Sequence, residues 1–202
     1  ERNYINETTA HFASLLALIL YLTKEKHLTY SNIKFNFFSI IFGSLPAIFV
    51  GGLILMMSLK FVSLKIIGYS SIIGGLILFI SDYRYNNLIK LENKVAKFIF
   101  AGFFQCLAFI PGFSRSGSCI IAFRLMGEER KVSSIFSLYL GVPIIVLSFL
   151  SNIRDFKVIN LDLNLLIIFI ITFFSAYLTL ILFIRFMNKI SFTPFVVYRI
   201  LL

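Results

Sequence analysis

The segment PGFSRSG, residues 111–117, places one arginine between two serines inside an otherwise apolar stretch of the chain. The guanidinium group of Arg115 is a planar fork of N–H donors that suits bidentate contact with a phosphate. Ser114 and Ser116 add hydroxyl donors, and Gly112 and Gly117 let a ligand approach the backbone closely. These residue types at this spacing predict an anion site, and phosphate is the anion that fits it best.

The same segment interrupts the regular structure around it. A continuous helix over residues 98–126 would be about 43 Å long, well beyond the roughly 30 Å core of a bilayer. Pro111 lacks a backbone donor and Gly112 can adopt the left-handed conformation that ends a helix. Ser114 or Ser116 can then cap a new helix. The two halves would measure about 20 and 15 Å, so neither half crosses a bilayer alone.

We therefore predict a re-entrant helical hairpin over about residues 98–126, with halves at 98–110 and 117–126 and its tip at 111–117. A single tilted and kinked helix remains the alternative. In the hairpin, the second half points its free N–H groups and the positive end of its dipole at the tip. This arrangement also favours an anion.

The composition indicates a membrane protein. Of the 202 residues, 59% are hydrophobic and 25 are Phe, whereas an ordinary globular domain is only about 45–50% apolar. Apolar runs of bilayer-spanning length or nearly so occur at residues 8–22, 37–59, 61–81, 132–151 and 163–184, and a last run begins at residue 192. The sequence thus predicts an all-α, polytopic integral membrane protein whose residues 1–202 form a single transmembrane domain.

The basic residues support the hairpin. If the chain crosses at every full span and returns after the hairpin, twelve Lys and Arg residues lie on one side and four on the other. The richer side holds Lys24, Lys26, Lys34, Arg84, Lys90, Lys94, Lys97, Arg124, Arg130, Lys131, Arg185 and Lys189, and the other side holds Lys60, Lys65, Arg154 and Lys157. By the positive-inside rule the richer side is cytoplasmic. If residues 98–126 crossed the membrane, the bias would be weaker.

Arg115 is the only Lys or Arg that we place deep in the bilayer, where a charge costs at least about 2.5–3.5 kcal/mol and indicates function. It has two alternative roles: binding an anionic ligand, or pairing with a buried carboxylate that locks helices together. All nine acidic residues lie in loops or at the edges of apolar runs, which favours the ligand. The net charge of +10 is spread over short loops, so nucleic acid is not an expected partner.

The segments resemble those of a known family. PGFSRSG is similar to the signature PGxSRSG of the bacterial undecaprenyl-diphosphatases of the bacitracin-resistance type. The segments HFASLLALILYL, SLPAIFVGGLI, FSLYLGVPIIV and FTPFVVYRILL also look like family segments, in the family's order. The resemblance covers nearly the whole chain.

The resemblance implies a function. Family members hydrolyse undecaprenyl diphosphate to undecaprenyl phosphate, which recycles the lipid carrier for peptidoglycan synthesis, supports cell shape and confers bacitracin resistance. They are multi-pass proteins of the bacterial inner membrane, built from two inverted repeats that each contain a re-entrant hairpin, and they act from the periplasmic side. The expected partners are therefore an isoprenyl diphosphate lipid and membrane lipids, and the sequence is compatible with a homo-oligomer.

The resemblance also assigns roles to individual residues. Arg115 is similar to the family arginine that holds the diphosphate, and Ser114 and Ser116 look like its flanking hydroxyls. We expect Arg115 and Ser114 to be catalytic, and these residues with Gly112, Ser116 and Gly117 to bind phosphate. Phe113 stands where a small or hydroxylated residue is common, and Cys119 replaces a usual threonine.

One family feature has no counterpart in these residues, namely the N-terminal hairpin with two glutamates, serines and a histidine. Hydrolysis requires an activated nucleophile, and a carboxylate near the tip would provide the base or hold a metal. The sequence shows no residue pattern for a metal or other cofactor, although a divalent cation is compatible with a diphosphate site. We expect a fragment that lacks this hairpin and the end of its last helix and is impaired alone. A transporter or flippase for an anionic substrate and an inactive remnant are the alternatives.

Overall fold

The computed structural model describes residues 2–24, 30–57, 63–83, 89–153, 163–187 and 189–201. The regular elements in these ranges are α1 (Arg2–Lys24), α2 (Tyr30–Met56), α3 (Leu64–Tyr83), α4 (Lys94–Gln105), the short 3-10 helix η1 (Cys106–Phe109), α5 (Arg115–Leu125), α6 (Arg130–Ile153), α7 (Leu163–Met187) and α8 (Thr193–Leu201). Five of them, α1, α2, α3, α6 and α7, are long and apolar enough to cross a membrane. The chain is an all-helical polytopic membrane protein, as its composition predicts.

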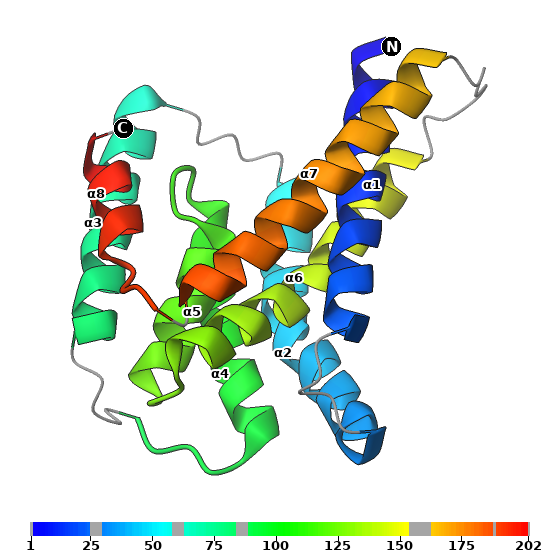
Figure 1. Cartoon of the computed structure of the whole chain (residues 1–202). Coiled ribbons are helices and arrows are strands. Elements are labelled where there is room, and N and C mark those ends of the chain that lie inside the picture. Colours follow the sequence, from blue (N-terminus) through cyan, green and yellow to red (C-terminus); the bar gives the residue numbers. More distant parts are fainter. Residues whose placement is uncertain are drawn as a thin grey trace.

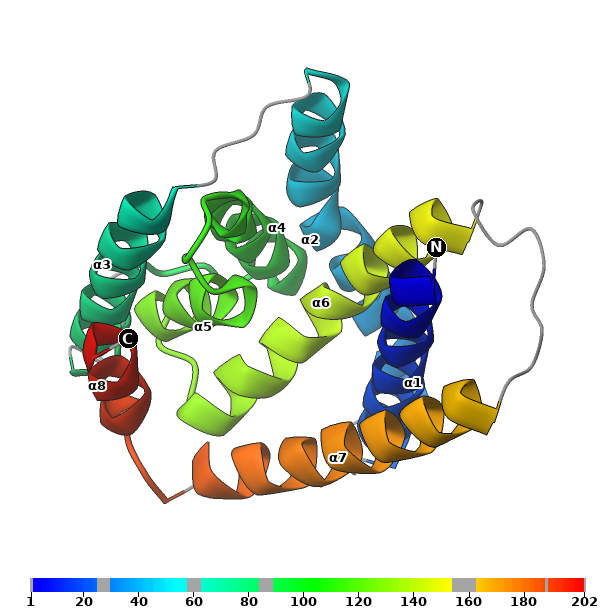
Figure 2. The same cartoon turned by 90° about the horizontal axis from the view of Figure 1, so that it is seen from above.

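The central helices are enclosed by the longer ones. Figure 1 shows α3 and α8 side by side at one flank and α1 beside α7 at the other. In the view from above, α4 and α5 lie between the α3–α8 pair and α2, and α6 runs past α5 toward α1 (Figure 2). Large apolar side chains such as Ile171 and Phe174 of α7 are more than 60% exposed, which suits a surface that faces lipid.

The chain reverses direction between α4 and α5. Lys97 Nζ, near the start of α4, lies 2.7 Å from a carboxylate oxygen of Glu128, just beyond the end of α5. The rings of Phe98 and Phe123 are 5.3 Å apart. Contacts between these ends require two antiparallel helices, so the alternative of one kinked helix is wrong.

The two helices of the hairpin begin at other residues than expected. Helix α4 begins at Lys94 rather than residue 98 because the side chain of Asn93 caps it, accepting a hydrogen bond from the Val95 N–H at 2.8 Å. After Gln105 the helix tightens into η1, and α5 begins at Arg115 rather than residue 117. The earlier start leaves only residues 110–114 outside helices at the tip.

Helix α1 is longer than the expected run at residues 8–22, because its polar first turns are also helical. Other expectations concern residues that the structure does not describe. The limits at residues 59 and 61 and the loop charges Lys26, Lys60, Arg84, Arg154 and Lys157 lie outside the described residues. The charge count and the inverted repeat therefore stay predictions from the sequence.

The backbones of α2 and α4 approach each other closely at Gly43 and Gly102. A Cβ at Gly102 would collide with the carbonyl oxygen of Gly43, and one at Gly43 would lie 2.8 Å from the carbonyl oxygen of Phe98. Small residues at both positions let the two helices approach this closely. By contrast, a Cβ at Gly52 of α2 would meet no atom within 4 Å.

The close contact between Gly43 and Gly102 predicts that a larger side chain at position 102 destabilises the protein. Gly102→Ala should lower the free energy of unfolding by about 1–3 kcal/mol, because backbone must move to admit the methyl group. Thermal unfolding in detergent, followed by circular dichroism, measures the change. Gly52→Ala is the matched control and should not destabilise the protein; equal destabilisation by both substitutions would contradict the close α2–α4 contact.

Candidate functional site

The tip of the hairpin is a tight turn built by Pro111 and Gly112. The residue before a proline avoids helical backbone, and Ile110 is accordingly extended, with φ −77° and ψ 116°. Gly112 has φ +92°, and the Phe113 N–H donates to the Ile110 carbonyl at 3.0 Å. Proline followed by a glycine with positive φ is typical of a type II turn. The expected left-handed glycine is therefore confirmed.

Helix α3 holds this turn through two serines. The Ser70 hydroxyl contacts the carbonyl oxygens of both Ile67 and Pro111, and the Ser71 hydroxyl donates to the Gly112 carbonyl at 3.2 Å. A Cβ at Gly112 would collide with Ser70 Oγ. The turn thus requires glycine at position 112 for two reasons: the positive φ and the lack of space for a side chain. Helix α3 in turn satisfies carbonyl groups that the irregular backbone exposes.

Helix α5 starts at the tip with a serine cap. Ser114 has extended backbone, and its Oγ accepts the Gly117 N–H at 3.2 Å. The Ser116 hydroxyl lies 3.3 Å from Ser114 Oγ. The N–H groups of Arg115 and Ser116 belong to the first turn and have no acceptor within the helix. The prediction of a capped helix start at the tip is confirmed, with Ser114 as the cap.

A cavity of about 400 Å³ opens at this helix start. Its polar lining comes from the tip, from Ser71 of α3 and from Arg199 of α8, and most of its apolar lining comes from α3, α7 and the segment of α8. The lining residues are Ser71, Leu78, Gly112, Ser114, Ser116, Gly117, Ile120, Phe183, Phe192, Phe195, Tyr198 and Arg199. The cavity therefore combines hydroxyl, N–H and guanidinium donors with aromatic surface.

The guanidinium that lines this cavity belongs to Arg199 of α8, which the sequence analysis missed. Its Nη2 donates to the Gly112 carbonyl at 2.6 Å. Its Nη atoms lie 3.0 and 3.4 Å from where a Cβ of Gly74 would be, and Nη1 lies 3.4 Å from that of Gly117. Like Arg115, Arg199 is a cation within an apolar run, and that signal could have identified it.

Arg115 does not line this cavity. Its guanidinium packs on α6, where a Cβ at Gly141 would lie 3.3 Å from Nη2 and 3.6 Å from Cζ. Within the described ranges the guanidinium of Arg115 makes no hydrogen bond or ion pair. Four of the five expected phosphate-binding residues thus line one cavity, and the fifth lies beside it on the α6 side.

None of the carboxylates in the described ranges lines the cavity. Asp82, only 6% exposed, is bound instead to Arg124 and Arg130 at the opposite end of α5. The described ranges also contain no group of three His, Cys, Asp or Glu residues that could hold a metal ion. The arrangement can bind an anion and stabilise added negative charge.

Comparisons with known proteins identify the family. Residues 3–202 match the family described as "Bacitracin resistance protein BacA". The undecaprenyl-diphosphatase of Pelagibacter ubique is 33% identical over 202 residues, 97% of this chain and 78% of that protein. The one from Sulfurovum sp. is 32% identical over 204 residues, 96% of this chain and 79% of that protein. A multi-pass protein with the PGFSRSG tip and this extent of similarity belongs to the BacA family of bacterial undecaprenyl-diphosphatases.

Proposed function

We propose that the protein binds the head group of undecaprenyl diphosphate at the hairpin tip and takes part in its hydrolysis to undecaprenyl phosphate and phosphate. The observation that carries this proposal is the cavity in which Arg199, Ser114 and Ser116 converge on the N-terminus of α5. In this proposal the diphosphate lies next to the Ser114 hydroxyl, at the start of α5. Arg199 binds it from the α3–α8 side, and Arg115 approaches it from the α6 side.

The donors at the tip suit the charge that develops during hydrolysis. Hydrogen bonds from fixed guanidinium groups and backbone N–H groups stabilise negative charge without reorganisation during the reaction. Arg199 keeps one Nη2 contact with Gly112 and retains further donors for the ligand. The Ser114 hydroxyl accepts the Gly117 N–H and can still donate its own proton to a phosphate oxygen.

The apolar part of the cavity supports an isoprenyl substrate. Phe183 and Phe195 pack edge to face with centroids 5.7 Å apart, and Tyr198 and Phe195 are 64% and 41% exposed. An ionic head group at the tip and a hydrocarbon chain along these rings match the polar and the aromatic lining of the cavity. Free phosphate or pyrophosphate would leave the aromatic walls unused.

The reaction requires a general base or a metal-bound hydroxide. Because no carboxylate of the described ranges lines the cavity, we expect this chain alone to bind the diphosphate and hydrolyse it slowly. In the proposed cellular role it recycles the lipid carrier at the bacterial inner membrane, with the site open to the periplasm, and so supports peptidoglycan synthesis and bacitracin resistance. The donor-lined cavity with aromatic walls also suits a second candidate, transport of an anionic lipid, in which binding occurs without turnover.

The two arginines give the first test. Arg199→Lys and Arg115→Lys should each weaken binding of farnesyl diphosphate about 10- to 100-fold, because lysine keeps the charge but loses the fork and its hydrogen bonds to a charged group. Isothermal titration in detergent measures affinity, and released phosphate measures turnover. Arg185→Lys, at an exposed position outside the cavity, is the control and should bind normally. Unchanged affinity in both test variants would remove the tip from diphosphate binding, and binding with no turnover in the wild type would favour transport.

The aromatic walls give the second test. Wild-type protein should bind farnesyl diphosphate more tightly than pyrophosphate, and Phe195→Ala should weaken only the farnesyl ligand, by about tenfold, because apolar contact area is lost. Phe186→Ala is the matched control, since Phe186 is 51% exposed and does not line the cavity. If Phe195→Ala weakened both ligands equally, the chain-binding role of the walls would be wrong.

A further inference from the structure

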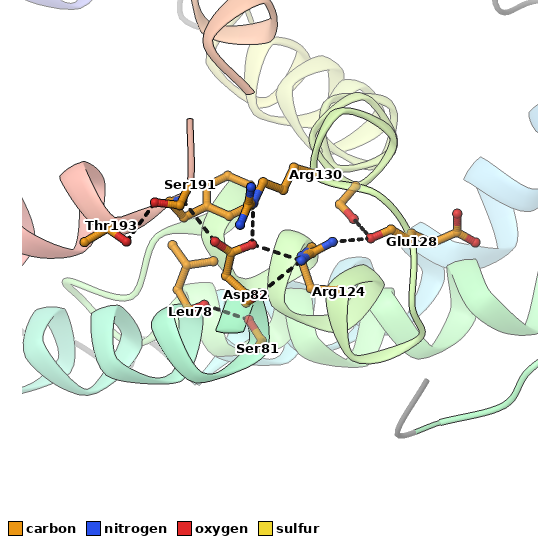
Figure 3. A network of polar contacts seen from close by, with 10 residues as sticks. Leu78, Ser81, Asp82, Arg124, Glu128, Arg130, Ser191 and Thr193 are labelled. Carbon is orange, nitrogen blue, oxygen red and sulfur yellow. Dashed lines mark hydrogen bonds and ion pairs between the residues drawn. The ribbon is translucent and has the colours of Figure 1, made fainter. Parts of the chain in front are cut away.

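Asp82 lies near the end of α3 that is remote from the tip, and it connects three other segments. Its Oδ1 lies 3.0 Å from Arg124 Nη2 at the end of α5 and 2.8 Å from Arg130 Nε at the start of α6. Its Oδ2 accepts the backbone N–H of Phe192, just before α8, at 3.1 Å. Figure 3 shows the side chains of Arg124 and Arg130 converging on this one carboxylate. We propose that Asp82 is a positioning residue that sets the placement of α8, and so of Arg199, against the tip.

Helix α3 holds the second half of the hairpin at both ends. Ser70 and Ser71 bind the carbonyl groups of the tip, and Asp82, about 18 Å further along the same helix, binds Arg124. Arg124 also donates to the Asp82 carbonyl at 3.1 Å and to the Glu128 carbonyl at 2.7 Å. Because both ends of α5 are fastened to one helix, α5 has little freedom to slide along α3.

The same carboxylate fixes the base of α8. Phe192 accepts the Val196 N–H at 3.1 Å, as the residue that begins the helix does, and its own N–H is the group bound by Asp82. Arg199 follows seven residues later, about two turns or 10 Å along the same face. This face packs closely on α3, since a Cβ at Gly75 would lie 3.7 Å from Arg199 Cβ and 3.8 Å from Val196 Cγ1.

An apolar cluster separates Asp82 from the cavity, so its action on the ligand is indirect. Leu78, Phe113, Ile120, Met187, Phe192 and Val196 belong to this buried cluster. The guanidinium groups of Arg124 and Arg130 meet at the carboxylate of Asp82. Both Asp82 and Arg124 are less than 7% exposed. Removing the acid alone would leave a buried cation without its counter-ion, which destabilises strongly.

The first measurement does not depend on any ligand. In Asp82→Asn, amide hydrogen exchange over residues 195–199 should become about tenfold faster, because the Phe192 N–H loses its charged acceptor and α8 opens locally. Glu128→Gln is the matched control, since it weakens the partly exposed Lys97–Glu128 pair and contacts α8 nowhere. If α8 exchanges in Asp82→Asn as it does in wild type, the proposal is wrong.

The second measurement rests on the proposed function and uses a double-mutant cycle. Asp82→Asn should weaken farnesyl diphosphate binding about tenfold when Arg199 is present and less than about twofold in the Arg199→Ala background. A general structural defect would weaken both backgrounds by the same factor, and that result would overturn the positioning role. Failure of wild type to bind would contradict the proposed function, whereas the exchange result would still decide the role of Asp82.

A second variant covers the case in which Asp82→Asn does not fold. Asp82→Asn combined with Arg124→Met removes the acid together with its most buried cation, so no unpaired buried charge remains. The Phe192 N–H still lacks its charged acceptor in this protein. The same faster exchange over α8 and the same dependence on Arg199 are expected, and a wild-type result for either would count against Asp82.

Discussion

The structure depends on how a broken helix is tolerated within an apolar protein. At residues 110–114 the backbone is irregular, and hydrocarbon supplies no partner for exposed N–H and carbonyl groups. Partners come from two other helices: Ser70 and Ser71 of α3, and Arg199 of α8. Their polar groups are drawn to one place by the need to satisfy the carbonyls of Pro111 and Gly112.

This constraint also creates the site. Once α3 and α8 have satisfied the carbonyl groups of the turn, the first N–H groups of α5, the serine hydroxyls and the remaining donors of Arg199 are left facing a cavity. All of these groups are donors, so the cavity favours an anion. Homologues in the BacA family are undecaprenyl-diphosphatases, and the aromatic walls agree with the proposed ligand, which has a hydrocarbon part.

Buried charge is divided between two places. In the described ranges the buried carboxylate is that of Asp82. It is surrounded by Arg124 at the end of α5, Arg130 at the start of α6 and the backbone N–H of Phe192 just before α8. The tip, by contrast, holds cations and no carboxylate of the described ranges. Because no acid of the described ranges lines the cavity, Arg199 is not neutralised there, and the tip keeps an excess of positive charge that suits an anion. Keeping Asp82 about 18 Å along α3 from Ser70 lets one helix stabilise the fold and leave the site cationic.

The sequence by itself determined the helical class, the membrane composition and the broken hairpin, because these follow from local properties. Apolar runs, a proline without an N–H, a glycine with positive φ and a capping serine act within a few residues of themselves. Only the tertiary structure decided that Arg199 reaches Gly112, that Arg115 faces Gly141 and that Asp82 binds Arg124 and Arg130. Each of these contacts joins residues at least 26 positions apart through long, flexible or shared side chains, so their partners are set by helix packing, which no local pattern encodes.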